Sequence, residues 1–363
     1  MSKNDMVYVM NVDWNWIKQR PHFIAELLND KFEVHVMYQH RYRRKGLQQR
    51  INSTLDIKPI YVIPRGDRYK FLSEINKKIK CSTIRKRIKK TNAGIIYLTF
   101  PDQFDVISDD YKGTVIYDCM DNHPAFVKDR KQKNKIIDSE QTLVHRADFI
   151  FTSSEHLKWE LIDRYGNDIE GKIYLVRNGY SGNIIEKEKT KPTTSNNLYI
   201  FTYFGTISSW FNFDYILRSL KEFPDIKYEL FGPLADTHIP KHERIHYYGT
   251  VEHDKLLDCV RNSDCLIMPF IINDIIESVD PVKLYEYINF NKNILTSYYE
   301  EIDRFDPFVY FYNSYDEFRK QIDLLKSNRK LKYSESERYS FLKENSWGSR
   351  VNCINTIIDQ KRI

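Results

Sequence analysis

Short apolar runs alternate with amphipathic segments of helical length along nearly the whole chain. In the first half the apolar runs lie at 7–10, 33–38, 60–63, 94–100, 114–118, 148–153 and 172–176. They are continuous rather than alternating, which is typical of strands buried on both faces of a parallel sheet. Segments with helical character lie between them, among them 17–30, 135–148 and 154–166. This pattern predicts an α/β domain with a doubly wound, Rossmann-like parallel sheet.

A turn-rich, charged stretch at 178–197 interrupts the pattern and has the Gly, Pro, Ser, Thr and Lys content of a linker. The alternation then restarts, with apolar runs at 198–205, 227–232, 244–249, 265–270, 293–297 and 308–312. We therefore expect a second Rossmann-like domain that faces the first across a cleft. The expected boundaries are 1–182 and 183–344 for the two domains, and 345–363 for a C-terminal helix that packs back on the first domain.

Length and composition agree with a two-domain globular protein. The chain has 363 residues, 41 % of them hydrophobic, and no run of 18 apolar residues. Its five cysteines are scattered without a CxxC pair, so neither a disulfide framework nor a zinc site is indicated. The N-terminus lacks the apolar core of a signal peptide. We expect a cytoplasmic protein.

The positive charge is concentrated near the N-terminus. Residues 1–100 contain 21 Lys and Arg against 8 Asp and Glu, with basic clusters at 41–50 and 77–90. A basic amphipathic helix at 77–90 suits an anionic membrane surface, where each basic residue contributes ~1 kcal/mol. Nucleic acid and a merely solvated face are the alternatives. We expect peripheral binding at the inner face of the cell membrane, and no nucleic acid partner.

The most informative stretch is 280–295, which follows a predicted buried strand and opens a helix near Pro281. The N–H groups and the dipole of a helix start favour an anion, and Lys283 adds a full charge in the first turn. Glu286 lies near the same face and can accept hydrogen bonds from a sugar diol. Lys283 and Glu286 would then hold the two ends of a nucleotide. The alternative is an ordinary surface pair beside a buried stripe.

Glycines end three predicted strands of the second domain, at Gly205, Gly232 and Gly249. Ligands of open parallel sheets bind beyond the carboxyl ends of the strands, so glycines there can mark backbone that approaches a ligand. A glycine that simply ends a strand at a turn is the alternative.

In the first domain, the loop after the fifth strand carries Asp118, Asp121 and His123. Carboxylates and an imidazole at a strand end can act as a general base on a hydroxyl. Asp118 still lies within the predicted strand, so of the three it is the one most expected to have a structural role. The spacing is not that of a DxD metal motif, so no metal ion is expected.

The first loop places Trp14 and Trp16 before a helix that begins near Arg20. A tryptophan in such a loop can contact a sugar or a lipid, although packing beneath the loop is the alternative. Arg20 at the helix start could reach a phosphate.

No GxGxxG and no GxxxxGK[ST] motif occurs, so dinucleotide oxidoreduction and P-loop phosphoryl transfer lack their main sequence support. Instead, six segments together resemble a GT-B glycosyltransferase of family 4, the retaining nucleotide-sugar class, and in particular its bacterial surface-polysaccharide or teichuronic-acid-like group. These segments are 14–23, 117–123, 153–157, 177–180, 203–216 and 269–295. The last two are the most specific.

The resemblance implies roles for individual residues. Glu286 would hold the ribose hydroxyls, Lys283 and the backbone of Gly205 and Thr206 would contact the diphosphate, and Val251 would lie near the base. Pro281 and Val282 would form the helix start in the donor site. Asp121 matches the acceptor-side catalytic position best, with Asp118 and His123 as rivals.

One departure from the family concerns its E-x7-E pair, which would need an acid at position 278, where this chain has Ser278. Either Glu277 or Asp280 would have to replace that acid.

The resemblance implies a metal-independent hexosyltransferase without a cofactor, whose co-substrate is a nucleoside-diphosphate sugar, most simply a UDP-sugar. The acceptor would be a hydroxyl of a lipid-linked oligosaccharide or a growing cell-surface glycan, and the product would retain the anomeric configuration. A nucleotide-sugar epimerase with the same architecture and a non-catalytic glycan-binding protein are the alternatives.

Overall fold

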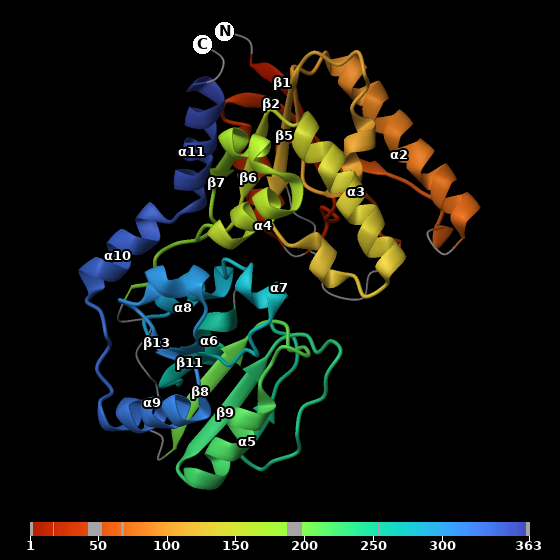
Figure 1. Cartoon of the computed structure of the whole chain (residues 1–363). Helices are drawn as coiled ribbons and strands as arrows, with labels where there is room; N and C mark the ends of the chain where they lie inside the picture. The colour runs from red at the N-terminus through yellow and green to blue at the C-terminus, as the bar shows by residue number, and fades with distance from the viewer. Residues whose placement is uncertain are drawn as a thin grey trace. The chain divides into compact units, whose positions relative to one another are not determined.

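The computed structural model describes residues 3–16, 18–42, 53–66, 69–186, 198–252 and 255–360. The chain divides into two compact units (Figure 1). Unit 1 comprises Met1–Asn178 and Trp347–Ile363, and unit 2 comprises Gly179–Ser346. Residues 43–50 of the first basic cluster and residues 187–197 of the predicted linker lie outside the described residues.

Unit 1 is built on a sheet of seven parallel strands in the order β3-β2-β1-β4-β5-β6-β7. The strands are β1 (Asn4–Met10), β2 (Phe32–Gln39), β3 (Asp56–Ile60), β4 (Ile95–Leu98), β5 (Thr114–Cys119), β6 (Phe149–Thr152) and β7 (Ile173–Leu175). The helices are α1 (Arg20–Leu28), α2 (Lys70–Thr91), α3 (Arg130–Arg146), α4 (Glu155–Tyr165) and α11 (Trp347–Gln360), with short 3-10 turns η2 (Pro101–Val106), η3 (His123–Phe126) and η4 (Asn167–Lys172).

The buried strands of unit 1 supply two cores because successive side chains point to opposite faces of the sheet. On one face, Val7 and Val9 pack in a cluster with Ile84 of α2 and Leu143 of α3. On the other face, the neighbouring strand residues pack in a cluster with α1 and α11, including Trp347. Trp347 stacks on Phe23 of α1 with ring centroids 5.2 Å apart. Figure 1 shows α11 alongside this sheet, on the side away from α2.

The edge strand β3 differs from its sequence-based prediction, which placed a strand at 60–63. In the structure β3 ends at Ile60, because its partner β2 ends at Gln39 and the Gln39–Ile60 pair is the last in the register. The apolar residues that follow, Val62 and Ile63, belong instead to a loop that leads to α2.

Unit 2 contains a second parallel sheet of six strands, in the order β10-β9-β8-β11-β12-β13. The strands are β8 (Tyr199–Phe204), β9 (Ile226–Phe231), β10 (Ile245–Tyr247), β11 (Cys265–Met268), β12 (Asn293–Ser297) and β13 (Tyr310–Tyr312). The helices are α5 (Phe213–Glu222), α6 (Leu256–Val260), α7 (Asp274–Glu277), α8 (Val282–Asn289), α9 (Tyr315–Ser327) and α10 (Glu335–Glu344), with a 3-10 turn η7 (Glu300–Phe305).

Two doubly wound α/β units confirm the predicted fold class. In each sheet the strand order reverses beside the first strand of the unit, between β1 and β4 in unit 1 and between β8 and β11 in unit 2. Ligands of open parallel sheets bind beyond the carboxyl ends of the strands at such a reversal. The residues that follow β1 and β8 are therefore the first places to look for a site. No helix in the described ranges is long and apolar enough to cross a bilayer.

Candidate functional site

The turn after β8 brings Gly205 directly beneath the side chain of Lys283. Gly205 has φ of 136°, in the left-handed region that favours glycine, and its N–H donates to the carbonyl of Phe231 at 2.9 Å. A Cβ atom at this position would lie 1.9 Å from Cε and 2.9 Å from Nζ of Lys283. Glycine is therefore required here for Lys283 to lie across the end of β8.

Lys283 stands in the first turn of α8, which begins at Val282. Pro281 is the N-cap, immediately before the first helical residue, and no side chain caps the helix. The first turn of an uncapped helix presents backbone N–H groups and a partial positive charge, which favour an anion. The end of β8 at Gly205 therefore carries positive charge, which comes from Lys283 and from the start of α8.

Glu286 lies within electrostatic range of this strand end. Burial lowers the pKa of Lys283, and the charge of Glu286 partly offsets this effect. Burial, reinforced by Glu286, also raises the pKa of Tyr180 to about 12. The structure therefore brings together Lys283 and Glu286, as the sequence suggested, and adds Tyr180. The asparagine Asn289, one turn beyond Glu286, donates to the Tyr180 hydroxyl, which in turn donates to the carbonyl of Asn183 at 2.8 Å.

The two candidates for the missing acid occupy different environments. Asp280 is 1 % exposed, forms an ion pair with Arg304 and accepts a hydrogen bond from the Tyr285 hydroxyl at 3.2 Å. This network holds the loop before α8 in place, which is a structural role. Glu277 is the last residue of α7 and is half-buried, so it is the better placed of the two to meet a ligand. Ser278, at the family's acidic position, is buried and donates to the carbonyl of Ile275.

The remaining donor-side candidates are backbone or packing positions. The carbonyl of Thr206 accepts the Tyr203 hydroxyl at 2.7 Å, which fixes the turn after Gly205. Val251 is half-buried and packs against the unit 2 core. Gly232, after β9, packs on the turn after β8, because a Cβ atom there would lie 2.0 Å from the carbonyl oxygen of Gly205.

In unit 1, Arg20 and Asp118 form a buried ion pair with side chains 4 % and 0 % exposed. Nη2 of Arg20 lies 2.7 Å from Oδ1 of Asp118, Nε lies 3.1 Å from both carboxylate oxygens, and Nη1 donates to the carbonyl of Val176 at 2.8 Å. The pair joins the start of α1 to the end of β5 and to the segment after β7. This corrects the expected phosphate contact of Arg20, because its guanidinium is buried on Asp118. It also places Asp118 in the interior and not in a reactive position.

The two tryptophans of the first loop have different surroundings. Trp14 is 2 % exposed and lies in a core cluster, with its ring 4.9 Å from that of His22. The expected acceptor contact of Trp14 is therefore replaced by packing beneath the loop. Trp16 is half-buried, and its backbone N–H donates to the carbonyl of Asp13 at 3.0 Å. Only Trp16 of the two keeps surface that a ligand could touch.

Asp121 and His123 follow β5 and are both half-buried. Burial raises the pKa of Asp121 to about 7, with Arg20 lowering it and Asp118 raising it further. Burial alone lowers the pKa of His123 to about 4. Its Nε2 atom is buried without a hydrogen-bond partner among the described residues, and its ring lies 4.6 Å from that of Phe100. Near neutral pH, Asp121 is thus close to its titration point and His123 is uncharged.

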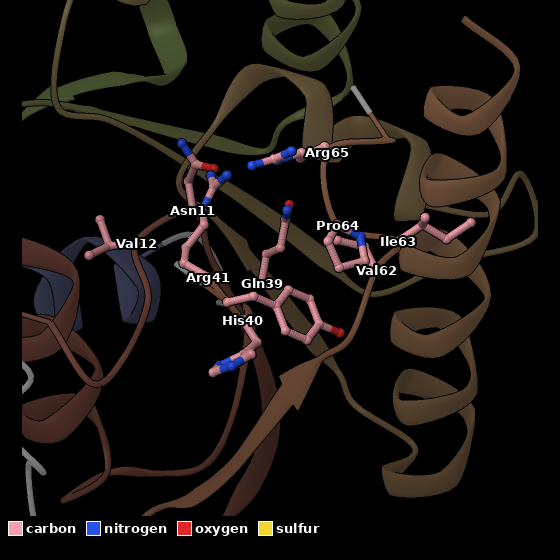
Figure 2. Close-up of a pocket in the computed structure, with 10 residues that line it drawn as sticks. Asn11, Val12, Gln39, His40, Arg41, Val62, Ile63, Pro64 and Arg65 are labelled. Carbon is pink, nitrogen blue, oxygen red and sulfur yellow. The ribbon is translucent and has the colours of Figure 1, made fainter. Parts of the chain in front are cut away.

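A pocket of about 430 Å³ opens in unit 1 beyond the carboxyl ends of β1, β2 and β3 (Figure 2). It is lined by Asn11, Val12, Gln39, His40, Arg41, Tyr42, Val62, Ile63, Pro64 and Arg65. The sequence-based argument placed Arg41 and Tyr42 in a basic cluster, but it did not predict a pocket here. The signal that could have found it is that polar residues follow two neighbouring apolar strands, at 39–42 and 64–65.

No family model matches this chain, and no curated protein matches it. Solved structures do match over nearly the whole length. Sucrose-phosphate synthase from Thermosynechococcus elongatus is 11 % identical with a TM-score of 0.72, and the match covers 99 % of each chain. Anabaena HepE, in complex with UDP and glucose, is 12 % identical with a TM-score of 0.62, again over 99 % of each chain.

A putative UDP-N-acetylglucosamine 2-epimerase from Listeria monocytogenes is 13 % identical with a TM-score of 0.53, over 99 % of this chain and 97 % of the epimerase. At these identities the similarity shows the fold alone. That fold is GT-B, with two Rossmann-like units in one chain.

Proposed function

We propose that the chain is a retaining glycosyltransferase, of the family 4 surface-polysaccharide group that its motifs resemble. It moves a sugar from a nucleoside-diphosphate sugar to a hydroxyl of a lipid-linked or growing cell-surface glycan. The observation that carries this proposal is the placement of Lys283 across Gly205 at the uncapped start of α8, with Glu286 one turn further along. This is the position at which an open parallel sheet binds a ligand.

The donor site follows from the charges at that strand end. A diphosphate meets Lys283, the first N–H groups of α8 and the backbone of Gly205 and Thr206. The ribose hydroxyls donate to Glu286, and the base lies beside Val251. The structure of Anabaena HepE, similar in fold, contains UDP and glucose, which supports UDP as the nucleotide.

The chemistry of transfer depends on charge at the leaving group. As the glycosidic bond to the diphosphate breaks, negative charge develops on the departing oxygens, and Lys283 with the helix start stabilises it. Burial lowers the pKa of Lys283, which means that its positive charge is held there at a cost in free energy, and a bound anion offsets this cost. This stabilisation requires no metal ion and suits departure and attack on the same face of the sugar, with retention of configuration.

Asp121 is the proposed catalytic base. A carboxyl group with a pKa of about 7 is half ionised at neutral pH and can accept the proton of an acceptor hydroxyl. His123, uncharged at that pH and with a buried unpartnered Nε2, is the proposed acceptor-positioning residue. Transfer requires that Asp121 reach the hydroxyl that attacks the sugar bound by unit 2.

Peripheral membrane binding through unit 1 is part of the proposal. Helix α2 carries all the basic residues of the second cluster, and Tyr69 and Phe71, at its N-cap and in its first turn, are 65 % and 75 % exposed. Exposed aromatic rings beside a basic face suit an anionic bilayer surface, which would bring a lipid-linked acceptor to the enzyme from the cytoplasmic side.

The test is product analysis by NMR. The protein is incubated with a UDP-hexose and an undecaprenyl-linked or soluble oligosaccharide acceptor, and the coupling constant of the new anomeric proton is measured. We expect a product with the anomeric configuration of the donor. An inverted product would overturn the retaining mechanism, and Asp121→Asn should lower kcat by about 100-fold or more while UDP binding persists.

The similarity to an epimerase makes epimerisation the second candidate function. Incubation of the UDP-hexose without acceptor separates the two. Conversion of the donor to its epimer would favour the epimerase, whereas an unchanged donor that is consumed only with acceptor supports transfer. A protein that binds glycans but neither binds UDP nor consumes the donor would be the non-catalytic alternative.

A further inference from the structure

The pocket in unit 1 has no role in the donor site, yet it lies beyond the carboxyl ends of three neighbouring parallel strands, β1, β2 and β3, where open parallel sheets bind ligands. Two arginines line it, Arg41 after β2 and Arg65 after β3, together with the amides of Asn11 and Gln39. Figure 2 shows Arg41 and Arg65 extending toward the part of the pocket where the ends of Asn11 and Gln39 lie. The arginines belong to loops more than 20 residues apart, and the pairing of β2 with β3 brings those loops together.

The backbone holds Arg65 in a conformation that arginine rarely adopts. Its φ is 60°, in the left-handed region where glycine and asparagine are favoured. The turn is closed by the N–H of Gly66, which donates to the carbonyl of Ile63 at 3.1 Å. The buried side chain of Asn76 binds both the N–H and the carbonyl of Ile63, at 2.8 and 3.1 Å. Strain of this kind is typical of ligand-binding positions.

Asp13 contacts the backbone of Arg41 and the ring of His40, and no ion pair joins it to the guanidinium of Arg41 among the residues that the structure describes. Asp13 accepts the backbone N–H of Arg41 at 2.8 Å and lies 3.7 Å from the ring nitrogen Nδ1 of His40. Within the part of the chain that the structure describes, neither Arg41 nor Arg65 forms an ion pair. Both guanidinium groups therefore offer planar, two-pronged donors to an anion in the pocket.

An aromatic group borders the same pocket. The ring of His40 lies 5.0 Å from that of Tyr42 and 5.4 Å from that of Tyr61, and the two tyrosines are 47 % and 59 % exposed. Exposed tyrosine rings present an apolar face with a polar edge, which suits the face of a sugar ring. The volume of about 430 Å³ lies in the range of small-molecule sites.

We propose that this pocket binds a negatively charged saccharide, with a phosphate ester or a carboxylate between Arg41 and Arg65 and a sugar ring against Tyr42 and Tyr61. The saccharide is the acceptor, or the part of the acceptor next to the reacting hydroxyl. This assignment rests on the proposed glycosyltransferase function. It adds that the enzyme selects acceptors by negative charge, through two loops of unit 1 that the donor site does not use.

Isothermal titration calorimetry of the full chain tests the assignment with three probes: glucose 6-phosphate, glucuronate and glucose. We expect at least one of the two anions to bind about 10-fold or more tighter than glucose, because each arginine-anion contact is charge-assisted. The tighter anion distinguishes a phosphate from a carboxylate acceptor. Equal affinity for glucose and both anions, or no binding of any of them, would overturn the assignment.

Variants locate the site. Arg41→Gln and Arg65→Gln should each weaken binding of the preferred anion by about 10-fold. Arg146→Gln is the matched control, because Arg146 is exposed and precedes the amino end of β6, three strands away from β1 in the sheet. Unchanged anion affinity in the double variant, or an equal loss in the control, would contradict the proposal.

Arg65→Gly separates binding from folding. Glycine adopts the left-handed turn without strain, so this variant should lose anion affinity while its melting temperature stays the same or rises. A parallel UDP titration of each variant keeps this inference distinct from the donor site. Loss of anion binding with intact UDP binding supports the pocket, whereas wild-type protein that binds the anion but not UDP would overturn only the proposed donor function.

Discussion

The two sheets place charged residues at their carboxyl ends in opposite ways. In unit 1 the charge at the end of β5 is buried and paired, as Asp118 with Arg20. In unit 2 the cation at the end of β8 lies across a glycine at an uncapped helix start, as Lys283 over Gly205. A buried charge with a well-placed partner fixes the architecture, whereas a partly buried cation at a helix start is poised for an anionic ligand.

The same contrast, between charged groups that are paired and groups that are not, occurs within unit 1. Arg20 and Asp118 join α1, β5 and the segment after β7, so they stabilise the position of the loop that follows β5. Asp121 and His123, a few residues further along that loop, keep perturbed pKa values because they are desolvated without such a partner. The ion pair thus supports the residues that we propose to react.

The largest expected effect comes from breaking the buried pair. Asp118→Ala leaves the guanidinium of Arg20 buried without its counter-charge, which should lower the free energy of unfolding by about 3–5 kcal/mol. Urea denaturation measures this, with Asp121→Asn as the control that leaves the pair intact. A loss below about 1 kcal/mol would show that the pair is not structural.

Next in size is the substitution Gly205→Ala. Its Cβ atom would collide with Cε of Lys283, and a φ of 136° is strained for alanine, so we expect about 1–3 kcal/mol of destabilisation and weaker UDP binding. Gly171→Ala is the control, because a Cβ atom at Gly171 has no neighbour within 4 Å. Equal UDP affinity for both variants would mean that Lys283 does not need to lie over Gly205.

The pH dependence of stability should distinguish the two desolvated groups. Because the pKa of Asp121 is raised to about 7, the folded state holds a proton that the unfolded state releases, and this group lowers stability as pH rises from about 4 to 7. His123, with a pKa lowered to about 4, does the reverse, so its contribution rises with pH between about 4 and 6.5.

Denaturation curves of Asp121→Asn and His123→Gln across this pH range test those signs. Relative to wild type, stability of the aspartate variant should fall less, or rise more, with pH, and the histidine variant should show the opposite. Each slope change is limited to about 1.4 kcal/mol per pH unit, the value for one proton. Slope changes of the same sign in both variants would contradict the assigned environments.

The smallest effect is expected at Arg65. Arg65→Gly removes the left-handed strain and should raise the free energy of unfolding by up to about 1 kcal/mol, offset in part by the greater entropy of glycine in the unfolded chain. Asn92→Gly is a useful comparison, because Asn92 ends α2 with φ of 50° and asparagine tolerates that region better. A larger gain at Asn92 than at Arg65 would argue against stored strain at Arg65.

The sequence predicts the fold well because its signals are local. Buried strands and amphipathic helices each occupy a continuous stretch. The segment 154–166 is an example, because Ser154 caps α4 by accepting the N–H of Leu157 and Gly166 follows its last residue. The proximity of Lys283 to Glu286 is equally local, since one turn of helix separates them.

Contacts between side chains that lie far apart in the sequence could not be predicted from such local patterns. Arg20 and Asp118 are 98 residues apart, and nothing in either segment alone shows that their side chains meet in the interior. Tyr180 lies close to Glu286 across an even longer stretch of chain. Arg41 and Arg65 share a pocket only because β2 and β3 are neighbours in the sheet, which the order of strands along the chain does not settle.

The most direct test of the account is calorimetric titration of UDP into the wild-type chain, Glu286→Ala and Glu243→Ala. Glu243 is an exposed carboxylate before β10, at the opposite edge of the unit 2 sheet, and serves as the control. The loss of charge-assisted hydrogen bonds at Glu286, about 1.5–3 kcal/mol, predicts affinity lowered by about 10- to 100-fold, with the control unchanged. Wild-type protein that does not bind UDP, or a Glu286→Ala variant that binds it equally well, would contradict the account.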